Sequence, residues 1–337
     1  MKRFCIKFCL LFLLIDGFVG LYHFCIRPNL SGDMGQIGQI LFGQEYNERV
    51  DNAYTHEREM VQKIFPQDSI TVPLITIGDS FSKLGKRGYS QFLSEKLNCE
   101  VQNVIYPFES SPVQTLVELL NHDRIPEETI VVLEVVERCF IWWLDYINLQ
   151  DTATAYYEEK KVEDLQPGNP RYLEDALLFL KKSAGIKQSI SCYPTNQDLF
   201  SHQKKHNKLY IYDSPWDKDG DLRFTELSEE KIVLAYKNME ALHELAESRG
   251  IKLIVLIAAD KYDVYEPFIT TDHPKNQILD YCPNVPWIIN TKPLMQEQAY
   301  AGVKDLYYIN DTHWTPAGAK IVADEIFRRL QDNHEDI

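Results

Sequence analysis

The sequence predicts a three-layer α/β fold, in which a mostly parallel sheet of about five strands is covered by helices on both faces. Two observations predict it. Short apolar runs rich in β-branched residues alternate with stretches of helical spacing along most of the chain. One run, residues 129–136, is apolar almost throughout, as is typical of a parallel strand buried on both faces. Strands that alternate with helices are joined by right-handed crossovers and lie parallel in one sheet.

Three of the predicted strands lie in the first half of the chain, at residues 72–77, 101–105 and 129–136. Each is short, apolar and bounded by polar or turn-forming residues, which favours a buried strand over a helix. Helical spacing separates them at residues 89–97 and 115–120. The first half therefore contributes three strands with helical crossovers between them.

The same alternation resumes towards the C-terminus. Gly250 closes a predicted helix whose apolar face is formed by Ile232, Tyr236, Met239 and Leu242. A fourth strand is expected at residues 252–258 and a fifth at 287–289. The last helix begins at Thr315, a good N-cap, followed by Pro316 at the first helical position.

Two segments do not follow this alternation. Residues 29–70 form a polar lead-in, with weak helical character over residues 57–65. Residues 139–227 form an aromatic insertion that interrupts the domain at residues 71–337 and contains at least one packed helix. The aromatic group at residues 140–157 is expected to form a small core of its own, because aromatic side chains dominate burial energetics. Stacking of these rings on sugars is the alternative.

The first 28 residues predict a membrane anchor. Three basic residues precede a mostly apolar run at residues 8–26, which Asp16 and His23 interrupt. The run is long enough to cross a hydrocarbon core of about 30 Å. No small-x-small cleavage site follows it, so an uncleaved anchor is favoured over a cleaved signal peptide or a buried amphipathic helix. The basic flank predicts a cytoplasmic N-terminus and an extracytoplasmic body attached to the cell membrane.

Charge and cysteine usage exclude other classes of function. The 337 residues carry 35 Lys and Arg against 50 Asp and Glu, a formal net charge of −15, which disfavours nucleic-acid binding. Seven cysteines are present without a C-x-x-C spacing, and Asp311 and His313 with the distant His273 lack a zinc spacing. No metal site is therefore expected. The four cysteines outside the anchor fit either two disulfides or buried thiols.

Two motifs carry the chemistry. Gly-Asp-Ser-Phe-Ser at residues 78–82 directly follows the first predicted strand, and Asp-Thr-His-Trp at residues 311–314 directly precedes the last helix. In a parallel α/β sheet both positions lie at the carboxyl edge, where ligands bind. There Ser80 can act as nucleophile, with its own N–H supporting an oxyanion. His313 can take the serine proton, and Asp311 can orient the imidazole.

This layout is similar to that of SGNH (GDSL-like) hydrolases, which have a flavodoxin-like fold. The longer forms here, Gly-Asp-Ser-Phe-Ser and Asp-Thr-His-Trp-Thr-Pro-x-Gly, resemble AlgX/AlgJ/DHHW-type polysaccharide O-acetyltransferase-like proteins. The resemblance extends over residues 70–140 and 230–333. In the alginate proteins the Asp-His motif precedes the serine, whereas the order here is that of ordinary SGNH enzymes and DltD-type membrane-anchored proteins. The resemblance implies that Ser80 is the nucleophile, His313 the general base and acid, and Asp311 its partner.

Three further residues follow predicted strands and could bind substrate or stabilise an oxyanion together with Ser80. The Gly-x-Asn-Asp pattern that supplies these donors in ordinary SGNH enzymes is absent. The guanidinium of Arg138 offers several hydrogen-bond donors in a fixed geometry that suits either role. The alternative is that Arg138 pairs with Glu134 or Glu137 and is structural. Lys261 and Tyr262 follow the fourth strand and could line the site or lie on its rim.

The resemblance implies a membrane-anchored O-acetyltransferase, or a component of one, that modifies an exported or cell-surface polysaccharide. The acetyl group would come from a multi-pass membrane acyltransferase partner. No cofactor is expected, because the sequence has no phosphate-binding Gly-rich loop. The first alternative is an SGNH carbohydrate esterase or deacetylase that uses the same triad with water. The second is a non-catalytic glycan-binding assembly subunit.

Overall fold

The structure is a computed structural model that describes Ile15, Gly17 and residues 45–54, 56, 58–106, 110–145, 147–149, 190–201, 207–212 and 227–335. Apart from its two described positions, the predicted anchor lies outside this part of the chain, as does most of the aromatic insertion. Among the described residues, no helix has both the length and the apolar character that crossing a membrane requires.

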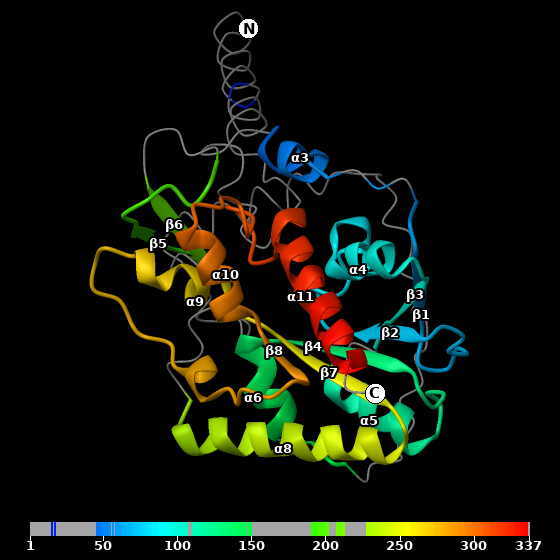
Figure 1. Ribbon diagram of the computed structural model, residues 1–337. Helices are drawn as coiled ribbons and strands as arrows, with labels where there is room; N and C mark the ends of the chain where they lie inside the picture. The colour runs from blue at the N-terminus through cyan, green and yellow to red at the C-terminus, as the bar shows by residue number, and fades with distance from the viewer. Residues whose placement is uncertain are drawn as a thin grey trace, which may run out of the picture.

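Six parallel strands form the central sheet, in the order β1-β3-β2-β4-β7-β8 (Figure 1). Their bounds are β1 Val61–Ile64, β2 Leu74–Ile77, β3 Val101–Val104, β4 Ile130–Val136, β7 Lys252–Ala258 and β8 Ile288–Asn290. All four side chains of β2 are buried, as are six of the seven in β4 and in β7. Strands buried on both faces explain why their sequences are apolar without alternation.

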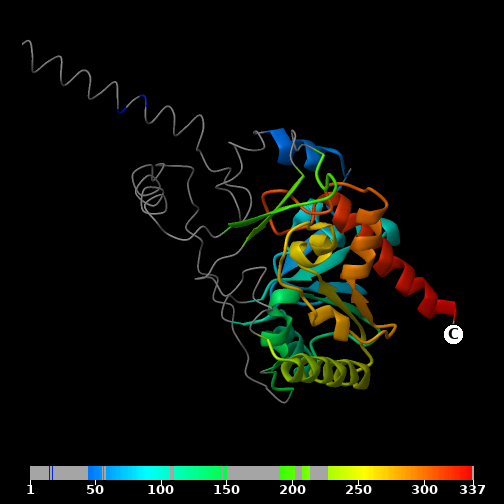
Figure 2. The ribbon, with the colours of Figure 1, turned by 90° about the vertical axis from the view of Figure 1, so that its left-hand side faces the viewer.

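Helices cover both faces of the sheet, which makes the fold three-layered (Figures 1 and 2). On one face, α11 contacts both α4 and α10, and on the other, α8 contacts both α5 and α6. The bounds are α4 Tyr89–Leu97, α5 Pro112–Asn121, α6 Glu137–Asp145, α8 Glu229–Ser248, α10 Thr291–Tyr300 and α11 Pro316–Glu335. The predicted α/β class is confirmed.

Helix α3 (Glu45–Asn52) lies in the lead-in and is not among the predicted elements, and two further elements differ from the sequence-based expectation. The segment predicted to be weakly helical contains β1 instead, which extends the sheet to six strands. Only Val61 and Ile64 of this strand are apolar, so its own pattern is weak. Pairing with β3 over four residues, from Val61 opposite Val101 to Ile64 opposite Val104, supplies the hydrogen bonds. The other addition is α10, which follows β8 and begins at the N-cap Asn290.

The insertion starts with a helix and includes a hairpin. In α6, Phe140 and Leu144 are buried, and the Phe140 ring lies 4.8 Å from that of Tyr236 on α8. This part of the aromatic group therefore packs as core. Strands β5 (Ile190–Pro194) and β6 (Lys208–Tyr212) form a separate antiparallel pair, and β6 contacts the short helix α9 (Lys261–Tyr265). The hairpin thus lies against the part of the domain that follows β7.

The strand order places a ligand-binding position beside β2. Strand β3 follows β2 in the chain and lies on one side of it, whereas β4 lies on the other side. The connections from β2 and β4 therefore leave the sheet in opposite directions, and α/β proteins bind ligands in the crevice that such a switch creates. The Gly-Asp-Ser turn directly follows β2, so the predicted nucleophile lies at this switch point.

Candidate active site

The turn after β2 exposes one side chain of the Gly-Asp-Ser-Phe-Ser motif. Ser80 is exposed, whereas Asp79, Phe81 and Ser82 are buried. The Asp79 carboxylate accepts a hydrogen bond from the Phe81 N–H at 2.9 Å and another from the Val136 N–H at 3.1 Å. Asp79 therefore joins the serine turn to the end of β4, and Ser80 is presented to solvent from a firmly held turn.

Gly78 is required here by close packing. A Cβ at this position would lie 2.1 Å from the Ser82 hydroxyl oxygen and 2.5 Å from a carboxylate oxygen of Glu134. Both of these side chains are buried and cannot move aside freely. The glycine of the motif therefore lets the turn lie directly on β4.

The second motif lies on a loop between two anchoring interactions. Tyr307 and Trp314 form an antiparallel β-bridge, which closes the loop that carries Asp311 and His313. Thr315 caps α11 by accepting from the Ala317 N–H at 3.1 Å. A Cβ on Gly318 would lie 2.3 Å from the Leu306 carbonyl oxygen, so the first turn of α11 packs directly on the loop. The Thr-Pro-x-Gly part of the motif thus supports the loop.

Within this loop, Asp311 and His313 form a dyad. An Asp311 carboxylate oxygen lies 2.5 Å from the ring Nδ1 of His313. The same oxygen accepts a hydrogen bond from the backbone N–H of His313 at 3.0 Å. The His313 and Asp311 side chains are only 13% and 15% exposed. Burial alone would raise the pKa of Asp311, but the hydrogen bond and charge of His313 outweigh it and lower that pKa. Asp311 is therefore ionised and orients the imidazole.

The two motifs meet although more than 200 residues separate them in the chain. The Phe81 ring centroid lies 4.9 Å from that of His313 and 4.6 Å from that of Trp314. Because Phe81 directly follows Ser80, this contact brings the serine turn against the dyad. The structure thus brings the turn that carries Ser80 into contact, through Phe81, with the loop that carries Asp311 and His313.

Lys261 lies beneath the loop of the dyad. Its ammonium group donates to the carbonyl oxygens of Asp311 at 2.9 Å, Tyr308 at 3.3 Å and Ile309 at 3.4 Å, and the side chain is fully buried. Its charge also contributes to the lowered pKa of Asp311. The neighbouring Tyr262 is buried too, and its hydroxyl donates to the Pro274 carbonyl at 2.5 Å. Lys261 therefore supports the loop from below.

We expect Lys261→Met to lower kcat/KM on the order of 10- to 100-fold, because the loop loses three hydrogen bonds and His313 shifts relative to Ser80. Loss of the positive charge also favours protonation of the Asp311–His313 pair, which moves the acid limb of the pH–rate profile to higher pH. Lys292→Met is the matched control, since Lys292 pairs with Asp263 and Asp280 away from the loop. It should cost about 3 kcal/mol of stability without moving the acid limb. Equal pH profiles in the two variants would contradict this role of Lys261.

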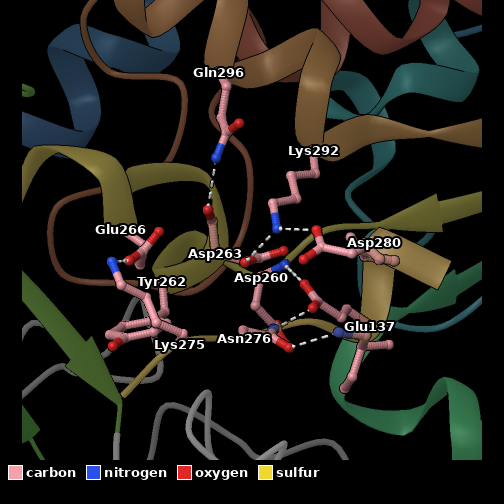
Figure 3. A network of polar contacts seen from close by, with 12 residues as sticks. Glu137, Asp260, Tyr262, Asp263, Glu266, Lys275, Asn276, Asp280, Lys292 and Gln296 are labelled. Atoms are coloured by element: carbon pink, nitrogen blue, oxygen red, sulfur yellow. Dashed lines mark hydrogen bonds and ion pairs between the residues drawn. The ribbon is translucent and has the colours of Figure 1, made fainter. Parts of the chain in front are cut away.

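Arg138 is engaged in a buried network at the ends of β4 and β7. Its guanidinium pairs with Asp260, a partner that the sequence analysis did not consider. Glu137 accepts from the Asp260 N–H at 2.9 Å and from the side-chain amide of Asn276 (Figure 3). Burial raises the pKa of Asp260 to about 6, although Arg138 opposes that shift. Asp260 follows β7, a strand that only the fold brings beside β4.

His273, which the sequence does not favour as a metal ligand, is engaged in other contacts. His273 contacts Glu266 at 2.6 Å and the Thr271 carbonyl oxygen at 2.6 Å. Across the described part of the chain, no cluster of three or more His, Cys, Asp or Glu side chains is arranged to hold a metal. Four cysteines fall within the same residues and form no disulfide: Cys99, Cys139, Cys192 and Cys282.

Comparison with known families gives a match over the C-terminal part of the chain, which contains the second motif. Residues 224–336 match the family model of the SGNH hydrolase-like domain, acetyltransferase AlgX. The C-terminal third of the chain is therefore similar to an SGNH hydrolase-like domain. The matched span includes Asp311 and His313, and Ser80 lies before it. Neither curated proteins nor solved structures gave a match.

Behind the serine turn lies a polar cluster that the sequence analysis did not predict. The Ser82 hydroxyl lies 2.8 Å from that of Tyr89 and donates to Glu134 at 3.0 Å. The Asn103 amide donates to the Ser82 carbonyl oxygen at 2.9 Å, which holds the turn against β3. One signal was present in the sequence: Glu134 is the only charged residue in the run that becomes β4. A carboxyl group in such a strand indicates a specific partner.

Proposed function

We propose that this protein is an extracytoplasmic O-acetyltransferase, or a component of one, held at the cell membrane by its N-terminal segment. It would acetylate an exported or cell-surface polysaccharide through an acetyl-serine intermediate on Ser80. The match to an SGNH hydrolase-like acetyltransferase domain supports the reaction class. The observation that carries the proposal is the contact of Phe81 with His313, which brings an exposed serine against an Asp-oriented histidine.

In the first half-reaction, Nε2 of His313 takes the Ser80 proton while the serine oxygen attacks the acetyl carbonyl carbon. The tetrahedral intermediate collapses, and His313 returns the proton to the leaving donor group, which leaves acetyl-Ser80. In the second half-reaction His313 deprotonates a sugar hydroxyl, which attacks the acetyl-serine. The proton then passes to the Ser80 oxygen as the ester bond breaks. Asp311 holds Nδ1 and stabilises the imidazolium in both steps.

The Ser80 N–H is proposed as one oxyanion donor. At this turn the Phe81 N–H is bound to Asp79, and the Lys83 N–H donates to the Ser80 carbonyl at 3.2 Å. The Ser80 N–H has no acceptor among the described residues. Such an N–H can stabilise the charge that develops on the acetyl oxygen. The guanidinium of Arg138 pairs with Asp260, and the Lys261 ammonium binds loop carbonyls. In this mechanism Arg138 and Lys261 therefore stabilise neighbouring elements and are not oxyanion donors.

The test uses the full chain in detergent with p-nitrophenyl acetate as donor. We expect a burst of nitrophenol and an acetyl adduct on the peptide that contains Ser80, detected by mass spectrometry. Added oligosaccharide should raise turnover and yield acetylated sugar. An adduct that water alone discharges would favour the esterase alternative. No adduct and no release would contradict the acetyl-serine mechanism and favour the glycan-binding assembly subunit.

A further inference from the structure

Glu134 lies directly behind the nucleophile turn, in the interior of the sheet. Its side chain is fully buried on β4, and one of its carboxylate oxygens closes the space behind Gly78. That oxygen accepts the Ser82 hydroxyl at 3.0 Å. The other oxygen has no hydrogen-bond donor among the described residues. Glu134 takes no part in the acyl-transfer steps above, so its burial requires a separate explanation.

The surroundings of Glu134 disfavour a second negative charge. Asp79 is the neighbouring carboxyl, and its oxygens already accept two backbone N–H groups, from Phe81 and Val136. No salt bridge within the described residues reaches either carboxyl. Three other titratable groups act on the pair: Lys83, which packs over the Tyr106 ring, Tyr89 of α4, and Asp260, which is itself paired with Arg138. Two adjacent buried carboxylates without a paired cation are costly unless one carries a proton.

We propose that Glu134 is a positioning residue that stays protonated at neutral pH and shares its proton with Asp79. This inference rests on the proposed acyl transfer at Ser80. In this protonation state the Glu134 carboxyl would donate to Asp79, while Ser82 donates to Glu134 and so accepts from Tyr89. Asp79 in turn receives the two backbone N–H groups that shape the turn. The chain of hydrogen bonds thus holds the loop that presents Ser80 from β4 and α4.

The electrostatics of the cluster agree with this protonation state. Burial first, and then the charge of Asp79 and the hydrogen bond to it, raise the pKa of Glu134 well above its usual value. A carboxyl that is protonated when folded and ionised when unfolded makes the folded state less stable as pH rises. The fall begins above the usual pKa of 4.5 and ends at the folded value. The free energy of unfolding therefore decreases as pH rises over this range, which would not happen with a side chain that is always neutral at this position.

Two substitutions separate protonation from shape. Glu134→Gln keeps both the size and a neutral donor and acceptor, so Ser80 acetylation should stay within about threefold of the wild-type rate. Glu134→Leu removes every hydrogen bond, and a displaced turn should slow acetylation about 100-fold. If Glu134→Gln lost as much activity as Glu134→Leu, a charged carboxylate would be required and the proposal would be overturned.

Two measurements do not depend on acyl transfer. The infrared difference spectrum of wild type minus Glu134→Gln should show the carbonyl stretch of a protonated carboxyl at pH 7; a carboxylate band in its place would overturn the proposal. The denaturant midpoint of the wild type should fall more steeply with pH than that of Glu134→Gln, and parallel slopes would also overturn it. If the wild type forms no acetyl-serine, the proposed function fails, while these two measurements still decide the state of Glu134. They do so even if Glu134→Leu does not fold.

Discussion

Replacing Ser80 by alanine is expected to reduce acyl transfer on the order of 10⁴- to 10⁶-fold, as removal of the nucleophile does in serine hydrolases. No neighbouring hydroxyl can take its place. Ser82 is the nearest in sequence, and it is buried against Tyr89 and Glu134. Because the Ser80 side chain is exposed, its removal should leave the free energy of unfolding within about 0.5 kcal/mol of wild type. Nitrophenol burst amplitude, adduct mapping and denaturant unfolding measure these quantities.

The control is Ser69→Ala, since Ser69 is another exposed serine and lies before β2. It should retain both the burst and the adduct on the Ser80 peptide. A Ser80→Ala variant that still formed an acetyl adduct in a single burst would place the nucleophile on another residue. A variant with lower stability and lower activity in proportion would indicate a structural role for Ser80.

Replacing Asp311 by asparagine should lower kcat about 10⁴-fold while the loop keeps its shape. The asparagine amide can still accept the His313 N–H, but it can also donate to Nδ1 and stabilise the wrong imidazole tautomer. With Nδ1 as acceptor, Nε2 carries a proton and cannot take that of Ser80. Steady-state kinetics with p-nitrophenyl acetate measure the loss, with Asp272→Asn, an exposed aspartate, as control.

The same variant should change the acid sensitivity of folding. The pKa of Asp311 lies below its usual value of 3.8 in the folded protein, because the opposing effect of burial is outweighed by His313. A lowered carboxyl pKa stabilises the folded state above the unfolded value, and this stabilisation is lost as pH falls through the folded value. Asp311→Asn lacks this contribution, so its stability should fall less than that of wild type below about pH 4. An unchanged acid dependence would show that the carboxylate is not held by His313.

The central sheet shows which elements can be predicted from the local sequence pattern and which cannot. The runs predicted at residues 129–136 and 252–258 became β4 and β7 because each is apolar almost throughout and forms a strand when it is buried. The last helix begins at Pro316 as predicted, with Thr315 as its cap. Strand β1 could not be predicted, since its hydrogen bonds depend on the exposed edge of β3. Burial and capping are local signals, whereas edge pairing is not.

The candidate site shows the same distinction between local sequence signals and tertiary contacts. By itself the sequence determined the two motifs, because a serine after a strand and an Asp-x-His before a helix are local patterns. Only the tertiary structure decided which groups surround them. Strand β2 lies beside β4 and β4 beside β7, which puts Glu134 behind the serine turn and Asp260 against Arg138. Lys261 likewise reaches carbonyl groups about 50 residues further along the chain. The identity of a buried polar partner depends on strand order, and strand order follows from the packing of the whole domain.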